Sequence, residues 1–505
     1  MRSPLARTLG AALLALALVG CAAESPEEPA PSEATTSEVT TGAPPAAPVQ
    51  PTRDVGVQLF QWTWDAIAAE CTDHLGPAGY GWVLTSPPQE HVLGEEWWTA
   101  YQPVSYRIES RLGTREEFAA MVATCADAGV AIVADAVINH MTGQDAPGVG
   151  WAGSAYEHYE YPGLYGFDDF HHCGLTPNDD IARYDDLAQV TTCELVNLAD
   201  LDTASPTVRA TIVTYLEDLL SLGVAGFRID AAKHMATQDV AAIVAELPEG
   251  TVILQEVIGA AGEPTVPADY AAHGKVFDFA YGKDLMGVVG GGFLPRYDTI
   301  PDNPLALPPV DQVIFVENHD TERNGSTYSY KDGEDHVLAN VLMLATGEGT
   351  PVLYSGYGFI TRDTGPLQDE SGRVFDATCL DEPPVANRYP EGQFVCQHRW
   401  PAFAGMVGWR NTVGTAPVTD VWSERRVLAI DRGGLGFIVA NGGAAASEQT
   451  LTTSLPPGEY CDVVTGGVAD GACVGTAVTV AEDGTVSLTI PPDTAIALHV
   501  GATAG

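Results

Sequence analysis

The chain has 505 residues, of which 45% are hydrophobic, so it is long enough for two or three domains with sizeable cores. Its formal net charge is −44, and it contains only four lysines. Because phosphate binding needs clustered cations, this composition argues against a nucleic-acid partner and favours a neutral substrate.

The first 21 residues have the pattern of a bacterial lipoprotein signal peptide. Arg2 and Arg7 form a positive segment, and residues 8–20 form an apolar stretch that is too short for a stable membrane anchor and ends beside Cys21. We predict cleavage before Cys21 and lipidation of its sulfur; the alternative is an ordinary secretory signal with a chance cysteine. Acyl chains would hold the protein at a membrane surface. We therefore expect it on the extracellular side of the bacterial cytoplasmic membrane, lipid-anchored there or released.

Residues 22–54 form a low-complexity segment. They are rich in Pro, Glu, Ser, Thr and Ala and contain few large apolar residues. Such a composition cannot bury enough apolar surface to fold, so we predict a disordered linker up to the first domain.

Eight cysteines remain after Cys21. An even number in an exported chain indicates disulfides, and no Cys-x-x-Cys or Cys/His cluster with zinc spacing occurs. Sequence alone leaves about a hundred pairings open. Proximity along the chain favours Cys173–Cys193, Cys379–Cys396 and Cys461–Cys473, which leaves Cys71–Cys125.

Apolar runs alternate with amphipathic helices from residue 55 to about residue 410. The run at 55–60 is apolar and alternating, whereas those at 131–137, 252–254 and 313–316 are nearly continuous, as expected for parallel strands that are covered on both faces. A capping box at 114–117 begins one helix, and Ser205-Pro206 begins another. The alternation predicts an α/β fold, a (β/α)8 TIM barrel made of residues 55–140 and 201–410.

Two regions depart from this alternation. Residues 141–200 are rich in Gly, His, Tyr and Asp and have no long helical stripe, which predicts a loop-rich insertion, domain B, after strand 3. Residues 411–505 contain short β-type runs separated by Gly, Pro and Asp. They predict a C-terminal all-β sandwich domain.

Polar residues follow the apolar runs at the points where barrel strands are expected to end. Carboxyl ends of parallel strands meet at one rim of a barrel, so the side chains there should converge. Four of them are acids, and three of these, Asp230, Glu256 and Asp320, come from three different strands; an alternative is that these three are ordinary strand-end caps. The whole set is Asp135, Asn139, His140, Arg228, Asp230, Glu256, His319 and Asp320.

Three converging carboxylates without a phosphate loop or a Ser or Cys nucleophile indicate glycoside hydrolysis. A retaining mechanism needs an ionised nucleophile and a protonated acid about 5–5.5 Å apart. Asp230 suits the nucleophile because the nearby Arg228 favours its charged form. Glu256 follows apolar residues and suits the acid, because burial and neighbouring anions raise a carboxyl pKa.

Four segments carry a family resemblance: DAVINH (135–140), GFRIDAAKH (226–234), LQEVI (254–258) and ENHD (317–320). They resemble the four conserved regions of the α-amylase family, glycoside hydrolase family 13. The similarity covers about residues 55–503, and GVQLFQWTWDAIAAEC, EEWWTAYQPVSY and QHRW are similar to animal and actinobacterial members in particular.

The resemblance implies endo-acting, retaining hydrolysis of α-1,4-glucosidic bonds in starch, glycogen and maltooligosaccharides. One alternative is another specificity within the family, either maltooligosaccharide-forming or transglycosylating. A second alternative is a non-catalytic glucan-binding lipoprotein, against which the intact acid trio argues. We expect a monomer.

The resemblance also implies what individual residues do. Asp230 matches the nucleophile, Glu256 the general acid, and Asp320 the third acid, which grips sugar hydroxyls. The remaining implied residues bind substrate or orient the nucleophile; they are Arg228, His140, His319, Trp97, Trp98, Tyr101, Gln102, Asp135, Lys233 and His234.

A structural Ca²⁺ between barrel and insertion is a further implication. Its ligands would be the side chains of Asn139 and Asp200 and the backbone carbonyls of Thr191 and His234, since Ca²⁺ takes oxygen ligands; alternatively, Asn139 and Asp200 are loop caps without a metal. The four cysteine pairs match those of the same subfamily. Val352 stands where animal-type enzymes carry a chloride-binding arginine, which argues against chloride activation.

Overall fold

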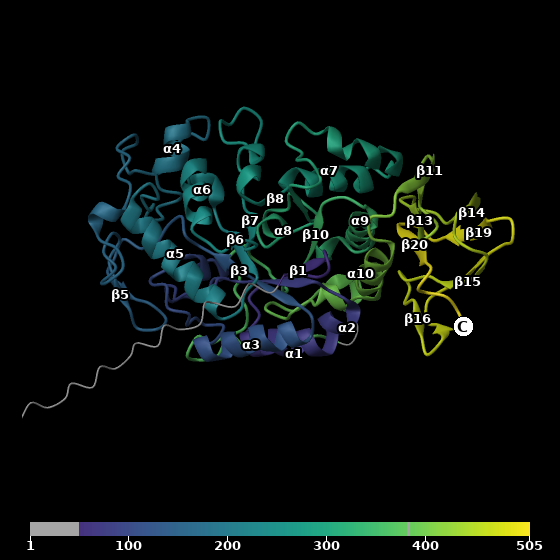
Figure 1. Cartoon of the computed structure of the whole chain (residues 1–505), viewed down its shortest axis with the longest axis horizontal. Coiled ribbons are helices and arrows are strands. Elements are labelled where there is room, and N and C mark those ends of the chain that lie inside the picture. Colours follow the sequence, from purple (N-terminus) through teal and green to yellow (C-terminus); the bar gives the residue numbers. More distant parts are fainter. Residues whose placement is uncertain (1–49, 381–383) are drawn as a thin grey trace, which may run out of the picture. The chain divides into compact units, whose positions relative to one another are not determined.

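A computed structural model describes residues 50–380 and 384–505 (Figure 1). The predicted signal peptide, Cys21 and most of the linker lie outside these residues and stay predictions. In the part of the chain that is described, no helix is both long and apolar enough to cross a membrane.

Eight parallel strands close into a barrel, as predicted (Figure 1). Around the barrel, each strand pairs with its neighbours in the order β1-β10-β9-β8-β7-β6-β3-β2. The strands are β1 (Gly56–Leu59), β2 (Trp82–Thr85), β3 (Ala131–Ala136), β6 (Gly226–Ile229), β7 (Val252–Gln255), β8 (Lys275–Phe277), β9 (Gln312–Ile314) and β10 (Thr350–Ser355).

Each barrel strand turns alternate side chains inward, and the inward set changes from apolar to polar along the strand. On β3, Val133 belongs to a buried apolar cluster, and Asp135 is the next residue on the same face. On β6, Gly226 and Arg228 are two residues apart and therefore point to the same face, with Gly226 nearer the start of the strand. The cluster that fills the lower part of the barrel, here called the apolar plug, includes Trp82, Leu84, Val133, Leu254, Phe277, Val313, Phe315 and Val352.

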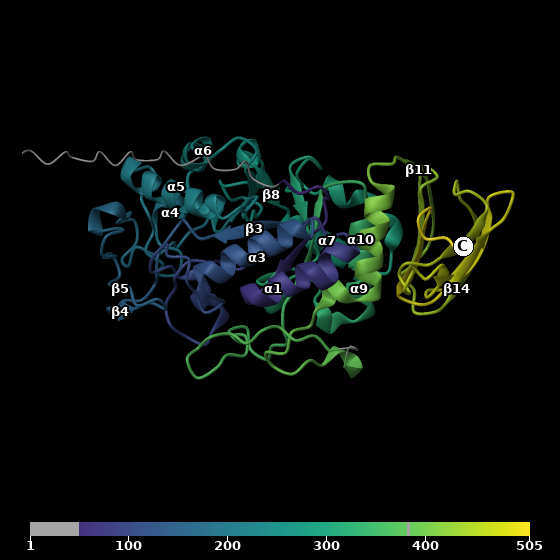
Figure 2. The same cartoon turned by 60° about the horizontal axis from the view of Figure 1, so that its bottom comes forward.

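Helices follow most strands and cover the barrel. The predicted capping box is present: Thr114 accepts from the Glu117 backbone, and Glu117 accepts from that of Thr114. Figure 2 shows α1 and α3 side by side on the outside of the barrel. The main helices are α1 (Trp64–Glu70), α2 (Gly76–Ala78), α3 (Arg115–Asp127), α5 (Pro206–Ser221), α6 (Thr237–Ala245), α7 (Phe279–Gly290), α8 (Thr321–Asn324), α9 (Glu334–Ala345) and α10 (Pro401–Val413).

The insertion after β3 is made mostly of loops. It holds β4 (Gly148–Val149), β5 (Ala155–Tyr156) and α4 (Leu187–Thr192). A second long loop, between β10 and α10, runs along one side of the barrel in green (Figure 2).

Residues after α10 form two four-stranded antiparallel sheets with a common apolar core, the predicted sandwich. One sheet has the order β11-β12-β13-β20 and the other β14-β19-β18-β15. The bounds are β11 (Val418–Glu424), β12 (Val427–Arg432), β13 (Gly436–Asn441), β14 (Ser447–Thr452), β15 (Gly458–Cys461), β16 (Val468–Ala469), β17 (Ala472–Cys473), β18 (Ala477–Val480), β19 (Thr485–Ile490) and β20 (Thr494–His499).

All four predicted disulfides are present. The disulfide Cys71–Cys125 links the residue after the end of α1 to α3. It therefore ties together two neighbouring helical segments on the outside of the barrel. The other three close short loops in the insertion, in the loop before α10 and in the sandwich: Cys173–Cys193, Cys379–Cys396 and Cys461–Cys473.

The segment just before β1 lies at the amino-terminal end of the barrel. Residues 51–54 line a hollow there together with Trp82, Lys275 and Thr350, which are the first residues of their strands. Asp54 forms an ion pair with Arg410 of α10 at 2.7 Å. The chain therefore enters the barrel at the end opposite to the carboxyl ends of the strands.

Glu70 joins α1 to the segment that precedes α10. Its carboxylate accepts from His398 Nε2 at 2.7 Å and from Arg399 Nε at 2.7 Å, and its side chain is 2% exposed. Burial alone would raise its pKa, but these hydrogen bonds and charges lower the pKa of Glu70 from 4.5 to about 2.

We predict that Glu70→Gln destabilises the protein by about 3 kcal/mol at pH 7, because it breaks a buried ion pair. The folded pKa lies below the unfolded one, so the ion pair stabilises the fold above about pH 4.5 and ceases to do so as the pH falls toward 2. Urea unfolding between pH 7 and pH 3 should show the difference from wild type shrinking. Asp73→Asn, an exposed change nearby, is the control, and a difference that does not vary with pH would contradict the prediction.

Gly226 is the position on β6 where the barrel has no room for a side chain. A Cβ there would lie 1.9 Å from the backbone oxygen of Val252 on β7. We expect Gly226→Ala to cost about 3 kcal/mol, because two strands must separate to admit it. Gly287→Ala, on an exposed helical turn with open space around it, should be neutral or slightly stabilising. Denaturant midpoints test both, and equal midpoints for the two variants would refute the steric account.

Candidate active site

A cleft of about 560 Å³ opens at the carboxyl ends of the barrel strands. Most of the predicted catalytic and substrate-binding residues line it; they are Trp97, Trp98, Tyr101, Gln102, His140, Asp230, Lys233, His234, Glu256, His319 and Asp320. Asp135 and Arg228 do not line the cleft. They lie beneath its floor and are 0% and 3% exposed.

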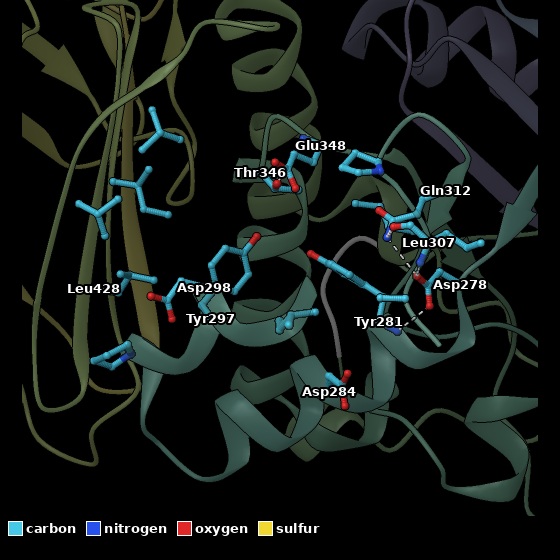
Figure 3. Close-up of a pocket in the computed structure, with 18 of the residues that line it drawn as sticks. Asp278, Tyr281, Asp284, Tyr297, Asp298, Leu307, Gln312, Thr346, Glu348 and Leu428 are labelled. Atoms are coloured by element: carbon cyan, nitrogen blue, oxygen red, sulfur yellow. Dashed lines mark hydrogen bonds between the residues drawn. The ribbon is translucent and has the colours of Figure 1, made fainter. Parts of the chain in front are cut away.

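A second cavity, of about 310 Å³, lies between α7, the segment at 294–302 and strands β11 and β12 (Figure 3). Its most buried acid, Asp278, caps α7 by accepting from the backbones of Ala280 and Tyr281, and it also accepts from Gln312 Nε2 at 3.1 Å. These contacts make Asp278 a structural residue. The cleft, in contrast, joins several carboxylates to a cation, and it is the candidate active site.

Arg228 is the centre of the site. Its NH1 lies 2.6 Å from Asp135 Oδ1 and 2.7 Å from Asp230 Oδ1, and its NH2 lies 3.0 Å from Glu256 Oε1. Asp135 is its register partner on β3, so the sheet itself sets this contact. One planar guanidinium therefore holds three carboxylates and brings Asp230 and Glu256 together, as the sequence predicted.

Two further donors fix the carboxylates around Arg228. The Tyr101 hydroxyl donates to Asp135 Oδ2 at 2.9 Å. The backbone N–H of Ala231 donates to Glu256 Oε2 at 2.9 Å, and Ala231 adopts a left-handed conformation with φ 49°. The sequence analysis missed Ala231, because an alanine side chain has no chemistry and its backbone conformation leaves no signal in the sequence.

Asp135, Asp230 and Glu256 share the Arg228 cation in a buried site, and Asp320 lies in the same cleft with a more exposed side chain. Burial is the largest effect: it raises the pKa of Asp135 to about 7 and raises those of Asp230, Glu256 and Asp320. The positive charge of Arg228 opposes this rise of the pKa at all four carboxyl groups. The charges of Asp230 and Asp320 both raise the pKa of Glu256, whereas Arg323 and Arg362 lower that of Asp320. The neighbouring negative charges thus favour the protonated form of Glu256.

The two predicted histidines are held as neutral rings. Burial lowers the pKa of His140 to about 4 and that of His319 well below its ordinary value. His319 is stacked between Phe60, at 4.9 Å, and Tyr101, at 5.1 Å between ring centroids. A neutral imidazole keeps one N–H, so each ring can donate one hydrogen bond.

Lys233 is held at the cleft wall by groups that the sequence analysis did not single out. Its Nζ donates to the Ile258 carbonyl at 2.7 Å and pairs with Glu263 Oε2 at 2.5 Å. The ammonium also lies 5.1 Å from the centre of the Tyr184 ring. The remaining cleft residues that were not predicted are Leu195, Val196, Leu198 and Asn324.

The residues predicted for calcium meet where the insertion joins the barrel. Residues 139–141 pair with residues 199–201, and Asn139 Nδ2 lies 3.3 Å from Asp200 Oδ1. His234 Nδ1 contacts the carbonyl of Val190, the neighbour of Thr191. Over residues 50–380 and 384–505, no group of three or more His, Cys, Asp or Glu side chains is arranged to hold a metal.

Comparisons with known proteins agree with this geometry. The model of the α-amylase catalytic domain matches residues 84–265, and that of the α-amylase C-terminal all-β domain matches residues 422–501. An α-amylase of Streptomyces violaceus is 44% identical over 92% of this chain and 77% of its own, and one of Tenebrio molitor is 39% identical over 88% and 97%. A solved α-amylase I variant from Eisenia fetida in complex with maltohexaose superposes with a TM-score of 0.83 at 33% identity, covering 90% of this chain and 99% of that one.

Proposed function

Because the chain belongs to the α-amylase family, we propose that it hydrolyses internal α-1,4-glucosidic bonds of starch, glycogen and maltooligosaccharides with retention of configuration. The observation that carries the proposal is the shared contact of Asp230 and Glu256 with Arg228. This contact supports the proposal because a retaining mechanism needs a nucleophile and an acid close together in one cleft.

The first step is a displacement at the anomeric carbon. The Asp230 carboxylate attacks that carbon, the bond to the leaving sugar oxygen breaks, and Glu256 gives its proton to that oxygen. The product of this step is a glucosyl ester on Asp230. In the second step Glu256, now a carboxylate, takes a proton from water, whose oxygen attacks the same carbon and releases Asp230.

Asp320 suits the part of the third acid. Its side chain is 36% exposed, whereas those of Asp230 and Glu256 are each 10% exposed, so Asp320 can reach sugar hydroxyls from the open side. His319 faces Gln58 Nε2 with its Nδ1, at 3.2 Å, so its Nε2–H can donate to the sugar. The single N–H of His140 donates to the Tyr101 carbonyl at 3.1 Å, and that ring holds the cleft residue Tyr101 in place. The rings of Trp97, Trp98 and Tyr101 offer flat apolar surfaces to the apolar faces of glucose rings.

The two alternatives to an α-amylase predict different outcomes with starch. A maltooligosaccharide-forming or transglycosylating enzyme would use the same acid trio but release one product size or new glucans. A glucan-binding lipoprotein would bind starch without releasing sugar. Reducing-sugar release from soluble starch, followed by the product profile over time, separates all three.

We further propose that the chain binds a structural Ca²⁺. Hard oxygen donors suit this ion, and Asn139 and Asp200 supply two of them in a site where each side chain is 1% exposed. Thr191 and His234 would add backbone carbonyls. Burial raises the pKa of Asp200 to about 6, so a divalent cation nearby would stabilise its charged form. The ion would hold the insertion against the barrel.

Anchoring by a lipid on Cys21, an extracellular location and a monomeric state remain parts of the proposal that stand on the sequence. Val352 is buried in the apolar plug, so that position offers no charge to an anion. This supports an enzyme that does not need chloride.

We predict that Asp230→Asn lowers the rate of starch hydrolysis by at least about 10⁴-fold, because an amide cannot form the ester intermediate. The variant should still bind maltoheptaose, measured by calorimetry, and should unfold at nearly the wild-type temperature. Asp218→Asn, a half-exposed surface carboxylate paired with Arg115, is the control and should retain wild-type activity. Substantial turnover by a pure Asp230→Asn sample would reject this nucleophile.

Removal of calcium should lower the thermal midpoint by roughly 3–5 °C, since a ligand present at several hundred times its Kd stabilises by about 3–4 kcal/mol and a chain of this size has a large unfolding entropy. Scanning calorimetry with EGTA, and then with added Ca²⁺, measures the loss and its recovery. Asp200→Asn should abolish the response. Asp202→Asn should keep it and is the matched control, because His171 contacts both acids, Asp200 at 2.7 Å and Asp202 at 3.3 Å. An unchanged midpoint in EGTA would contradict the site.

A further inference from the structure

Arg323 is a buried cation beside the cleft to which the proposed mechanism gives no step of its own, although its charge lowers the pKa of Asp320. It lies on the short helix α8, three residues after Asp320, and is 9% exposed. Its Nε lies 3.7 Å from Glu322 Oε1, which is too long for a strong ion pair. Other groups must therefore compensate for its burial.

Aromatic rings surround the Arg323 guanidinium. Cation–π attraction acts within about 6 Å of a ring centre, and it strengthens when water is excluded. Four rings meet this distance from the guanidinium carbon: Phe359 at 4.5 Å, Tyr357 at 5.0 Å, Phe60 at 5.7 Å and Trp97 at 5.7 Å.

Hydrogen bonds join Arg323 and Trp97 to the same stretch of backbone, residues 361–364 in the loop after β10. NH1 of Arg323 donates to the carbonyls of Arg362, at 3.4 Å, and Thr364, at 3.2 Å. The indole N–H of Trp97 donates to the same Arg362 carbonyl at 2.7 Å. The loop, the indole and the arginine therefore form one connected unit.

This unit ends in the cleft wall. Trp97 lines the cleft, and its ring meets His319 edge-on at 5.4 Å and Tyr101 at 5.8 Å. If the indole were free to turn, a bound sugar chain would have to order it first. Ordering one large side chain in advance improves affinity roughly two- to tenfold.

We propose that Arg323 is a positioning residue for glucan binding. It fixes the Trp97 indole and the 361–364 loop as one wall of the cleft, and so sets the affinity for the sugar chain without touching the reacting atoms. This inference depends on the proposed function, because it takes the ligand to be an α-glucan. A purely structural arginine would support the fold and leave affinity unchanged.

The test is Arg323→Met, which keeps the side-chain length and removes the charge and the donors. We expect KM for maltoheptaose to rise about five- to tenfold while kcat stays within about threefold of wild type. In the Asp230→Asn background, the Kd of maltoheptaose measured by calorimetry should rise by the same factor. Arg323→Lys keeps a cation among the rings but loses the planar guanidinium, so its KM should lie between those of wild type and Arg323→Met.

Lys331→Met is the matched control. Lys331 belongs to the same aromatic cluster: its Nζ lies 3.2 Å from the centre of Phe359, and it donates to the Phe359 carbonyl at 3.1 Å. Its removal should lower the thermal midpoint and leave KM at the wild-type value. An equal rise of KM in this variant would overturn the proposal.

Two other outcomes also decide the matter. If folded Arg323→Met and Arg323→Lys both keep KM and Kd within twofold of wild type, Arg323 does not position the cleft wall. If the wild type releases no sugar from starch, the proposed hydrolysis is wrong. The Kd of maltoheptaose, compared between Asp230→Asn and the double variant with Arg323→Met, then still shows whether Arg323 sets the affinity for glucan.

Discussion

The contact of one guanidinium with three carboxylates governs the structure of this site. Arg228 cannot lose its proton at any ordinary pH, so it supplies a fixed positive charge in a place that water does not reach. The carboxylates around it outnumber it, and burial penalises each unpaired negative charge. At least one proton must therefore stay in the cluster. The geometry thus provides an anion and an acid next to each other, which is the pair that double displacement requires.

The barrel makes this cluster possible by separating its two halves. Its lower half is filled by the apolar plug, whose large side chains keep water away from the floor of the cleft. The inward positions one step further along the same strands carry Asp135 and Arg228. A strand that slipped by one residue would turn these groups outward, so the closed parallel ladder is also what fixes the catalytic geometry. Stability and chemistry depend here on the same register.

Much of this could be read from the sequence, and the reasons are physical. Continuous apolar runs with acids at their ends predicted the barrel and the meeting of Asp230, Glu256 and Asp320, because parallel strands place their carboxyl ends on one rim. Local spacing of the cysteines predicted the disulfides. Contacts made by backbone or by distant loops could not be predicted in this way. The N–H of Ala231 on Glu256, Glu263 beside Lys233, and the 361–364 loop on Trp97 all depend on how irregular segments return to the barrel.

The entry of the chain at the amino-terminal end of the barrel has a consequence for a polymeric substrate. Residues 51–54 are packed against the first residues of the strands, and Asp54 is tied to Arg410. Residues 51–54 therefore lie at the end of the barrel that faces away from the cleft. A glucan chain that enters the cleft meets the loops at the carboxyl ends of the strands, and residues 51–54 take no part in that entrance.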